Sequence, residues 1–500
     1  MVVFLVIISI VPYVITLDNP FIWDSVDRVQ NNELIRSFDS IPSLFLEPTN
    51  SPGGLPYYRP LHYVLYVMEY SVFGDTPLGY RIIALLLHAL STVLFYRILM
   101  MWRSNIRHAM YAAMIFAVIP GRAEAVYWVY GASNLLLAVF ILLSLLFYMR
   151  ERRVLAIVFF SLALLSRETA VLFPVILLLY ELTESRHIRR NIVVRIIPFV
   201  ALVVLFVLVR SVILGATPPI SNLPFFQIIY SIGVIVSTYL KITFIPDGMV
   251  VHYPFVEYLE LTHRVAIGLL VVALSIVVGI VLYKRDRFLF FWYIWFFIWI
   301  ALWFNVGRFG YFLLTEKELY LSAAGAAVLL AQLISTQKYK IFIITLLLLY
   351  SAGTIIIRAA YWKDPVTYFS ESVKSSQTAF FLYGQLGHTY MMNGEYTRAI
   401  SIYKEGLQLT DAKSKFRNDL GNAYLALKDT AKAKMYWFIA YNQDNRNYVA
   451  PKNLGTLAYH EGNIKGAMFY YSKHIERAKY PDTNVVRRLA LLRIKFGALK

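Results

Sequence analysis

Cysteine is absent from this chain of 500 residues. Disulfide bridges, thiolate metal sites and a thiol nucleophile are therefore excluded. Charged residues are also scarce, since Asp, Glu, Lys and Arg together make up 16% of the sequence, whereas hydrophobic residues make up 59%. A chain of this length that is so poor in charge and so rich in apolar residues is typical of a polytopic membrane protein.

The charges that are present are mainly basic, with a formal net charge of +18. Many of the arginines lie in short loops between apolar runs, which is a signal of membrane topology. We therefore predict the lipid bilayer as a partner and no nucleic acid. The histidines His62, His88 and His252 are isolated and are interpreted as polar fillers, so no metal site and no cofactor is expected.

Apolar runs of roughly 17–25 residues are long enough to cross a bilayer, and we predict about eleven spans. The opening run is interpreted as a retained first span. The sequence SRETA (166–170) divides one long run into two short spans, because a charge at a helix centre costs about 2.5–3.5 kcal/mol. The spans lie near residues 1–17, 79–101, 106–120, 132–149, 193–214, 263–283, 288–304, 318–335 and 340–358, with the two short spans within 154–182.

Orientation follows from the basic loops, which we place on the cytoplasmic side. These loops contain Arg103 with Arg107, RERR (150–153), RHIRR (186–190), KRDR (284–287) and QKYK (337–340). The segments that then face outward are 18–78, 121–131, the SRETA turn, 215–225 and 305–317. Segment 226–246 cannot cross without inverting the later spans, so we predict that it is re-entrant or interfacial.

From residue 361 onward the composition becomes that of a soluble helical domain. Leu-Gly pairs at 386, 420 and 454 recur every 34 residues, and alanines and aromatics recur in the same register. We expect these to be the small and large positions at which two antiparallel helices interlock, the small residue letting the helices approach and the aromatic ring filling the gap beside it. This period predicts tetratricopeptide (TPR) repeats near 380–413, 414–447 and 448–481, closed by a capping helix at 483–497. We therefore expect a membrane domain at 1–360 and an extracytoplasmic TPR domain at 361–500, whose groove binds a peptide or protein partner.

Carboxylates and cations from separate segments are expected to meet on the outer face. A carboxylate at the rim of a bilayer is partly desolvated, which raises its pKa and makes it a better base for a hydroxyl group. Guanidinium and ammonium groups at the same depth suit a phosphate at the headgroup level. The groups in question are Asp24, Asp27, Arg59, Glu124, Arg167, Glu168, Glu316 and Lys317.

The motifs around these residues occur in a characteristic order. They are FIWDSVDRV (21–29), YYRPL (57–61), LLLH (85–88), PGRAEAVYWVYGASNLL (120–136), SRETA, TEKELYLSAAG (315–325) and YWKDP (361–365), followed by the repeats. In this order they resemble the transmembrane-and-TPR O-mannosyltransferases, which are glycosyltransferases of the GT-C class. The resemblance therefore implies an all-α, polytopic GT-C domain followed by a TPR solenoid.

The resemblance also implies an activity. It is the inverting transfer of a sugar from a polyprenyl-phosphate donor to a hydroxyl of a protein or glycan acceptor on the extracytoplasmic face. Asp24 would be the general base, with Asp27 as a possible second acid, and Glu124 would orient the base or the acceptor. Arg59, Arg167 and Lys317 would bind the donor phosphate, supported by Glu168, Glu316 and Tyr320.

Some positions depart from the family pattern and keep alternatives open. Ser25 stands where the family has a second acid, so Asp27 substitutes for it, one acid suffices, or the site is degenerate. In the last case the chain is a membrane-anchored TPR scaffold for an envelope or glycan-assembly complex. Asp24 could also be a solvated acid at the end of a span, and Glu124 could simply pair with Arg122.

Three further expectations concern the surroundings of the site. Arg167 and Glu168 could form an ion pair that locks the SRETA turn. The aromatic run 291–304 is expected to face lipid and the membrane interface rather than to bind a sugar. The host membrane is expected to be the cell membrane of a prokaryote.

Overall fold

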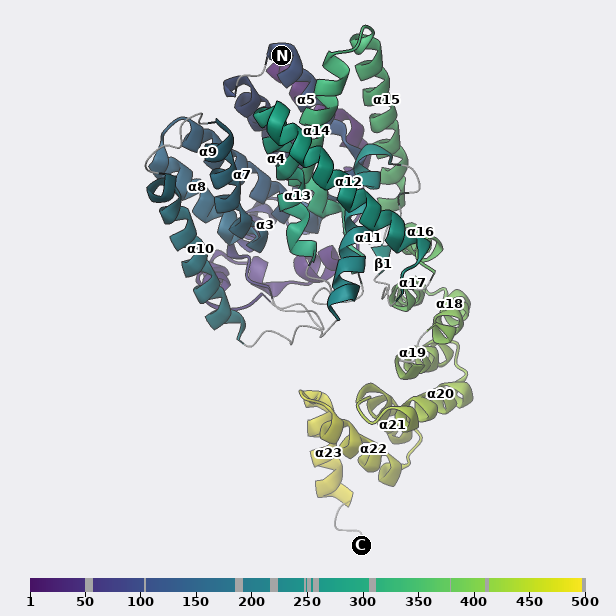
Figure 1. The fold of residues 1–500 in the computed structure, drawn as a ribbon. Helices are drawn as coiled ribbons and strands as arrows, with labels where there is room; N and C mark the ends of the chain where they lie inside the picture. The colour runs from purple at the N-terminus through teal and green to yellow at the C-terminus, as the bar shows by residue number, and fades with distance from the viewer. Residues whose placement is uncertain are drawn as a thin grey trace. The chain divides into compact units, whose positions relative to one another are not determined.

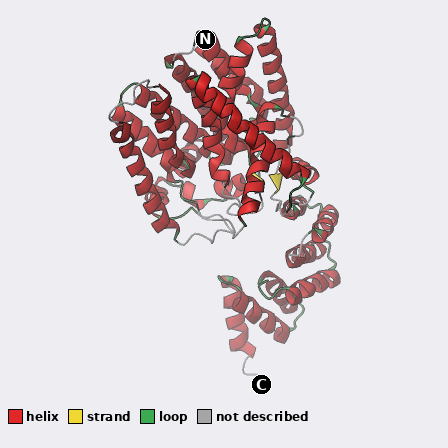
Figure 2. Cartoon of the chain, viewed as in Figure 1, coloured by secondary structure: helices red, strands yellow, loops and turns green. Residues whose placement is uncertain are grey.

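Helices make up most of the chain in the computed structural model, and one small sheet accompanies them (Figures 1 and 2). The structure describes residues 1–49, 57–102, 105–184, 192–215, 224–246, 249, 253–254, 260–304, 312–377, 379–409 and 413–496. It divides into two units, Met1–Asp364 and Pro365–Lys500. The predicted loop RHIRR and most of 215–225 and 305–317 lie outside the described residues.

The first unit contains fifteen α-helices among the described residues. Its two strands, β1 (Tyr253–Pro254) and β2 (Phe312–Leu314), pair antiparallel. The helices are α1 (Val2–Ile10), α2 (Ile41–Leu46), α3 (Pro60–Phe73), α4 (Pro77–Met101), α5 (Ile106–Val118), α6 (Glu124–Tyr127), α7 (Ala132–Met149), α8 (Arg153–Ser166), α9 (Phe173–Glu184), α10 (Ile192–Leu214), α11 (Phe225–Phe244), α12 (His263–Arg285), α13 (Arg287–Ile300), α14 (Leu319–Ser335) and α15 (Lys340–Ala359).

Seven helical segments among the described residues are long and apolar enough to cross a membrane. Six coincide with predicted spans, and the seventh is α11. Four shorter apolar helices, beginning at Val2, Ile106, Arg153 and Arg287, coincide with four more predicted spans. The remaining predicted span, the second of the two short ones within 154–182, corresponds to α9. The predicted all-α integral membrane protein is therefore confirmed.

The loops of the first unit gather at two ends of its helical bundle. At one end Trp102 donates a hydrogen bond to Glu184, and Arg195 pairs with Glu181 at 3.0 Å. At the other end Arg59 pairs with Glu168, which joins the first outer loop to the SRETA turn. This grouping agrees with the predicted topology, and which end faces the cytoplasm stays a prediction.

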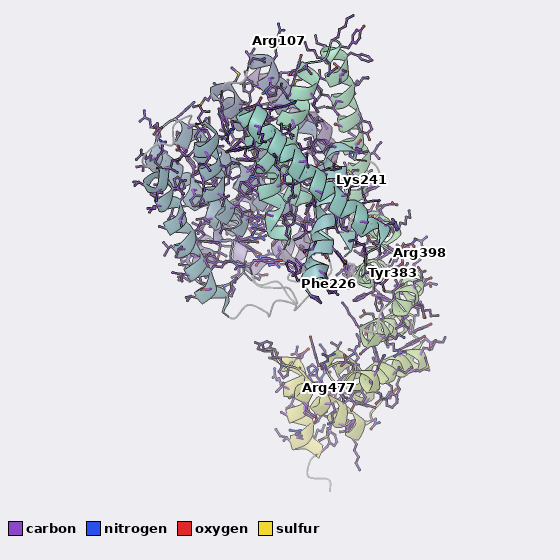
Figure 3. The ribbon with its side chains drawn as sticks, viewed as in Figure 1. Arg107, Phe226, Lys241, Tyr383, Arg398 and Arg477 are labelled. Carbon is purple, nitrogen blue, oxygen red and sulfur yellow. The ribbon has the colours of Figure 1, made fainter. Side chains whose placement is uncertain are left out.

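Helix α11 begins at the end of the bundle opposite Arg107, where Figure 3 shows Phe226. Its later turns pack against two of the segments that are predicted to face outward, 121–131 and 305–317. The Tyr239 hydroxyl donates to the carbonyl of Thr315 at 3.2 Å, and a Cβ on Gly121 would lie 2.8 Å from Ile242 Cγ2. Because α11 is itself long and apolar enough to cross a membrane, the expectation that segment 226–246 is re-entrant or interfacial stays a prediction.

Much of the aromatic run 291–304 is buried in the protein and does not face lipid as predicted. Trp292, Trp295 and Trp299 on α13 are buried, with at most 3% of each residue exposed. The Trp295 indole donates to the carbonyl of Leu321 on α14 at 2.7 Å. The prediction was wrong because the composition of an apolar helix does not distinguish burial in protein from contact with lipid.

The second unit consists of helix pairs with a repeated contact. A Cβ on Gly387 would overlap the ring of Tyr403, and Gly421 stands in the same relation to Trp437. This is the interlocking that the 34-residue period predicts, whereas the identification as TPR repeats stays a prediction. The helices are α16 (Pro365–Ser375), α17 (Phe380–Met392), α18 (Tyr396–Gln408), α19 (Lys413–Ala426), α20 (Thr430–Gln443), α21 (Val449–His460), α22 (Ile464–Arg477) and α23 (Thr483–Phe496).

Candidate active site

The segment that carries Asp24 has an unusual backbone. Trp23 has a φ of 56°, in the left-handed region that a bulky residue rarely adopts. Its indole stacks on that of Trp128, with ring centroids 5.3 Å apart and an interplanar angle of 10°. Stacking of this kind contributes about 0.5–1.5 kcal/mol, which offsets part of the backbone strain. Asp24 is thereby held beside the second outer loop.

Asp24 is half-buried, and no hydrogen bond or ion pair to its carboxylate is found within the described part of the chain. Burial raises the pKa of Asp24, the nearby charges of Arg28 and Lys317 lower it, and Asp27 raises it. The net direction is upward. Asp27 is exposed to solvent. Ser25, which stands at the position of the second acid in the motif that it resembles, is buried, with 1% of the residue exposed.

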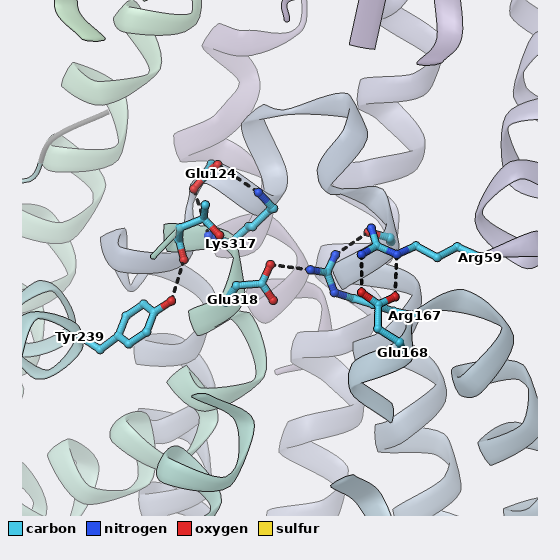
Figure 4. A network of polar contacts seen from close by, with 9 residues as sticks. Arg59, Glu124, Arg167, Glu168, Tyr239, Lys317 and Glu318 are labelled. Atoms are coloured by element: carbon cyan, nitrogen blue, oxygen red, sulfur yellow. Dashed lines mark hydrogen bonds and ion pairs between the residues drawn. The ribbon is translucent and has the colours of Figure 1, made fainter. Parts of the chain in front are cut away.

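Glu124 and Lys317 form an ion pair (Figure 4). The pair lies next to Trp128, the residue that stacks on Trp23. The backbone N–H of Lys317 donates to Glu124 Oε2 at 3.1 Å, and Lys317 Nζ lies 3.8 Å from Oε1. Nζ also lies 4.5 Å from the centre of the Trp128 ring. The structure thus brings together Glu124 and Lys317 from separate segments, and the charge of Lys317 also acts on Asp24.

The alternative pair of Glu124 with Arg122 is not formed. Arg122 is fully buried, with its guanidinium 3.8 Å from the ring centre of Phe116 and 4.7 Å from that of Tyr320. Tyr320, a predicted supporting residue, shares a 2.7 Å hydrogen bond with His88. Both side chains are buried, and this hydrogen bond agrees with the interpretation of His88 as a polar filler.

Two further ion pairs lie side by side in Figure 4. Arg59 binds Glu168 in a bidentate manner, at 2.8 and 2.6 Å, and Arg167 pairs with Glu318. The expected pair of Arg167 with Glu168 was wrong, because each side chain binds a residue more than 100 positions away in the chain. Arg167 is also buried rather than exposed at its turn, and it donates to Ser133 Oγ at 2.9 Å.

Charge on Glu168 is stabilised by these arginines. Burial by itself would raise the pKa of Glu168, but the guanidinium groups of Arg59 and Arg167 outweigh it and hold that pKa below its usual range. Glu168 is therefore ionised at neutral pH. Arg59 and Arg167 each have a carboxylate partner already, so less of their charge is available to a ligand.

Glu316 is held away from the Asp24 group. It accepts hydrogen bonds from Arg358 on α15, at 2.8 and 2.9 Å, and from the Tyr253 hydroxyl at 3.0 Å. These bonds fix the short helix Glu316–Glu318, and hence Lys317, at the end of α15. Arg358 and Tyr253 belong to no motif, so the sequence alone gives no signal for either residue.

Arg28 is another residue that the sequence analysis missed. It is 4% exposed and makes no ion pair with a carboxylate in the described ranges. Its NH1 donates to the Tyr63 hydroxyl at 3.1 Å, and its guanidinium lies between the rings of Tyr57 and Tyr130, at 5.3 and 5.6 Å. It stands four residues after Asp24 in FIWDSVDRV, a spacing that could have drawn attention to it.

A small cavity of about 10 Å³ lies beside Glu318, and Asp24 is not among its lining residues. It has room for about one water molecule. Asn134, Thr169 and Trp299 line it, and each has a buried polar side-chain atom that makes no hydrogen bond to any described residue. No cluster of His, Asp and Glu that could hold a metal ion is found where residues are described.

Comparison with known proteins gives relatives but no matching family model. The chain is 25% identical over 212 residues to protein O-mannosyl-transferase F38B6.6 of Caenorhabditis elegans, covering 40% of this chain and 30% of that protein. It is 26% identical to human protein O-mannosyl-transferase TMTC3, covering 26% and 15%, and 27% identical to Tmtc1 of Drosophila melanogaster, covering 33% and 20%. The chain therefore spans less than a third of the length of these relatives.

Among solved structures, similarity extends over more of the chain at lower identity. The oligosaccharyltransferase of Archaeoglobus fulgidus matches 76% of this chain and 58% of its own, with 14% identity and a TM-score of 0.43. ArnT from Cupriavidus metallidurans, bound to undecaprenyl phosphate, matches 91% and 80%, with 14% identity and a TM-score of 0.39. Scores in this range do not establish a shared fold. The similarities in sequence agree with the resemblance of the motifs: over at most 40% of its length, this chain is similar to protein O-mannosyl-transferases.

Proposed function

We propose that the protein is an integral-membrane glycosyltransferase that moves a sugar from a polyprenyl-phosphate donor to an acceptor hydroxyl, with inversion, on the extracytoplasmic face. The observation that carries this proposal is the half-buried carboxylate of Asp24, free of ion-pair partners in the described structure and next to Lys317 and Arg28. The names of its relatives favour mannose as the sugar and a protein as the acceptor.

Asp24 is the general base in this proposal. A carboxylate whose pKa is raised, and which no cation holds by direct contact, accepts a proton more readily than one in an ion pair. As the acceptor oxygen attacks the anomeric carbon, its proton passes to Asp24. The bond between the anomeric carbon and the phosphate oxygen breaks, and polyprenyl phosphate leaves with that electron pair. Glu124 holds Lys317 toward the reacting groups.

Arg28 and Lys317 provide the positive charge that the leaving phosphate needs. Stabilisation of developing charge is usually the largest catalytic contribution of such a site. Arg28 has no carboxylate partner in the described ranges, and the Lys317 ammonium is 3.8 Å from Glu124. Arg59 and Arg167 are held more closely by their carboxylate partners, so we assign them to supporting the phosphate site rather than to binding the phosphate directly. This assignment adds Arg28 to the residues inferred from the resemblance.

Purified full-length protein in lipid nanodiscs tests the proposal. Polyprenyl-phosphate mannose, and separately the glucose donor, is supplied with a peptide rich in serine and threonine or with a glycan acceptor. We expect a hexose mass increase on one acceptor and release of polyprenyl phosphate that requires that acceptor. If no donor is consumed while the second unit binds peptide, the scaffold hypothesis replaces the enzyme.

A further inference from the structure

Arg81, on the first turns of α4, joins two segments of the candidate site. It is 3% exposed, and its guanidinium donates to three backbone carbonyls. Nε donates to Asn19 at 3.1 Å, NH2 to Pro20 at 2.8 Å and NH1 to Tyr127 at 2.5 Å. No carboxylate pairs with Arg81 in the described part of the chain. Among the described residues, its side chain therefore donates hydrogen bonds to main-chain carbonyls alone.

These carbonyls belong to the segments that carry the proposed base and its neighbour. Asn19 and Pro20 precede Asp24 by five and four residues, and Tyr127 follows Glu124 by three. The stack of Trp23 on Trp128 is a second contact between the same two segments. Neither segment is a long helix that could hold its position alone, since α6 has only four residues.

We propose that Arg81 is a positioning residue that sets the distance of Asp24 from Glu124 and Lys317 without touching substrate. The guanidinium suits this role because its donors are arranged in a rigid planar fork that reaches several acceptors at once. Lysine at this position would keep the charge but offers a single nitrogen, which cannot reach all three carbonyls. The inference rests on the proposed function for its catalytic part, whereas its structural part stands independently.

The test compares Arg81→Lys and Arg81→Met with a matched control, Arg97→Met, in the full-length protein. Arg97 lies on the same helix, is exposed and makes no hydrogen bond to the part of the chain that the structure describes. Hydrogen exchange followed by mass spectrometry gives the structural readout, in peptides covering residues 17–30 and 123–131. Transfer kinetics give the second readout. Because a displacement of about 1 Å can reduce a rate about 100-fold, we expect kcat to fall by that order while the donor KM changes less than threefold.

The proposed positioning role of Arg81 is supported if both Arg81 variants exchange faster in these two peptides alone and Arg97→Met exchanges like the wild type. An Arg81→Met protein whose exchange and kcat match the wild type overturns it. So does a loss of protection spread evenly over the whole first unit, because that is the result of a general packing role. If the wild type transfers no sugar and the two peptides still lose protection in the Arg81 variants, the structural role of Arg81 stands and only the proposed function fails.

Discussion

The ion pair of Arg59 with Glu168 predicts an asymmetric response to mutation. Glu168→Gln removes the carboxylate and leaves the Arg59 guanidinium, whose side chain is 5% exposed, without its partner. Arg59→Met instead leaves Glu168, whose side chain is 30% exposed and can be hydrated in part. Breaking a buried pair by removing one partner costs about 3–5 kcal/mol, and we expect Glu168→Gln to fall in this range. Arg59→Met should cost less, about 1–3 kcal/mol.

The assay is hydrogen exchange of the full-length protein in detergent, in peptides covering residues 57–66 and 164–172. A loss of 3–5 kcal/mol corresponds to roughly 100-fold to 4000-fold faster exchange, since about 1.4 kcal/mol is a factor of ten. The double variant Arg59→Met with Glu168→Leu removes both charges and should recover to within about 1 kcal/mol of the wild type. Equal effects of the two single variants, or additive effects in the double variant, would refute the reasoning.

Three other predictions follow from the same structure. In the second unit Gly387→Ala, which forces a Cβ into the Tyr403 ring, should destabilise helices α17 and α18 by about 1–3 kcal/mol by hydrogen exchange. Its control Gly384→Ala meets only Phe416 at 4.0 Å and should be neutral or stabilising by about 0.5–1 kcal/mol, so equal effects contradict the interlocking. Arg28→Met should raise the donor KM about 10- to 150-fold, for a lost charged hydrogen bond of about 1.5–3 kcal/mol, and a KM no higher than that of Arg36→Met argues against Arg28. Activity should fall as the pH drops through the raised pKa of Asp24. Asp27→Asn should move this fall to lower pH, because the charge of Asp27 raises the pKa of Asp24. A pH profile of activity that is unchanged in Asp27→Asn would exclude Asp27 from the site.

Sequence reasoning succeeded where one element carries the signal by itself. The length and apolar character of single runs predicted the spanning helices, and a 34-residue period predicted which glycine faces which aromatic ring. The charge of the short loops predicted which loops share an end of the bundle. In each case the physical cause is local, since bilayer thickness and helix packing act on one segment or one repeat.

It failed where a partner lies far along the chain. Neighbouring residues suggested the pairs Arg122 with Glu124 and Arg167 with Glu168, but adjacent side chains do not generally face each other. Glu168 binds Arg59 instead, 109 residues away, and Lys317 binds Glu124 across 193 residues. Such partners are set by the packing of helices, which composition and spacing do not report. Ser25 shows the same limit, because its burial is a property of the folded loop.

The central claim is that Asp24 accepts the proton of the acceptor hydroxyl. The most direct measurement compares sugar transfer by the wild type, Asp24→Asn and Asp39→Asn, an exposed acid of the same loop, with donor binding measured in parallel. A missing general base costs typically 100-fold to 10,000-fold in rate, so we predict that Asp24→Asn loses transfer by this factor and still binds donor. Transfer by Asp24→Asn at the rate of the wild type and of Asp39→Asn would contradict the account.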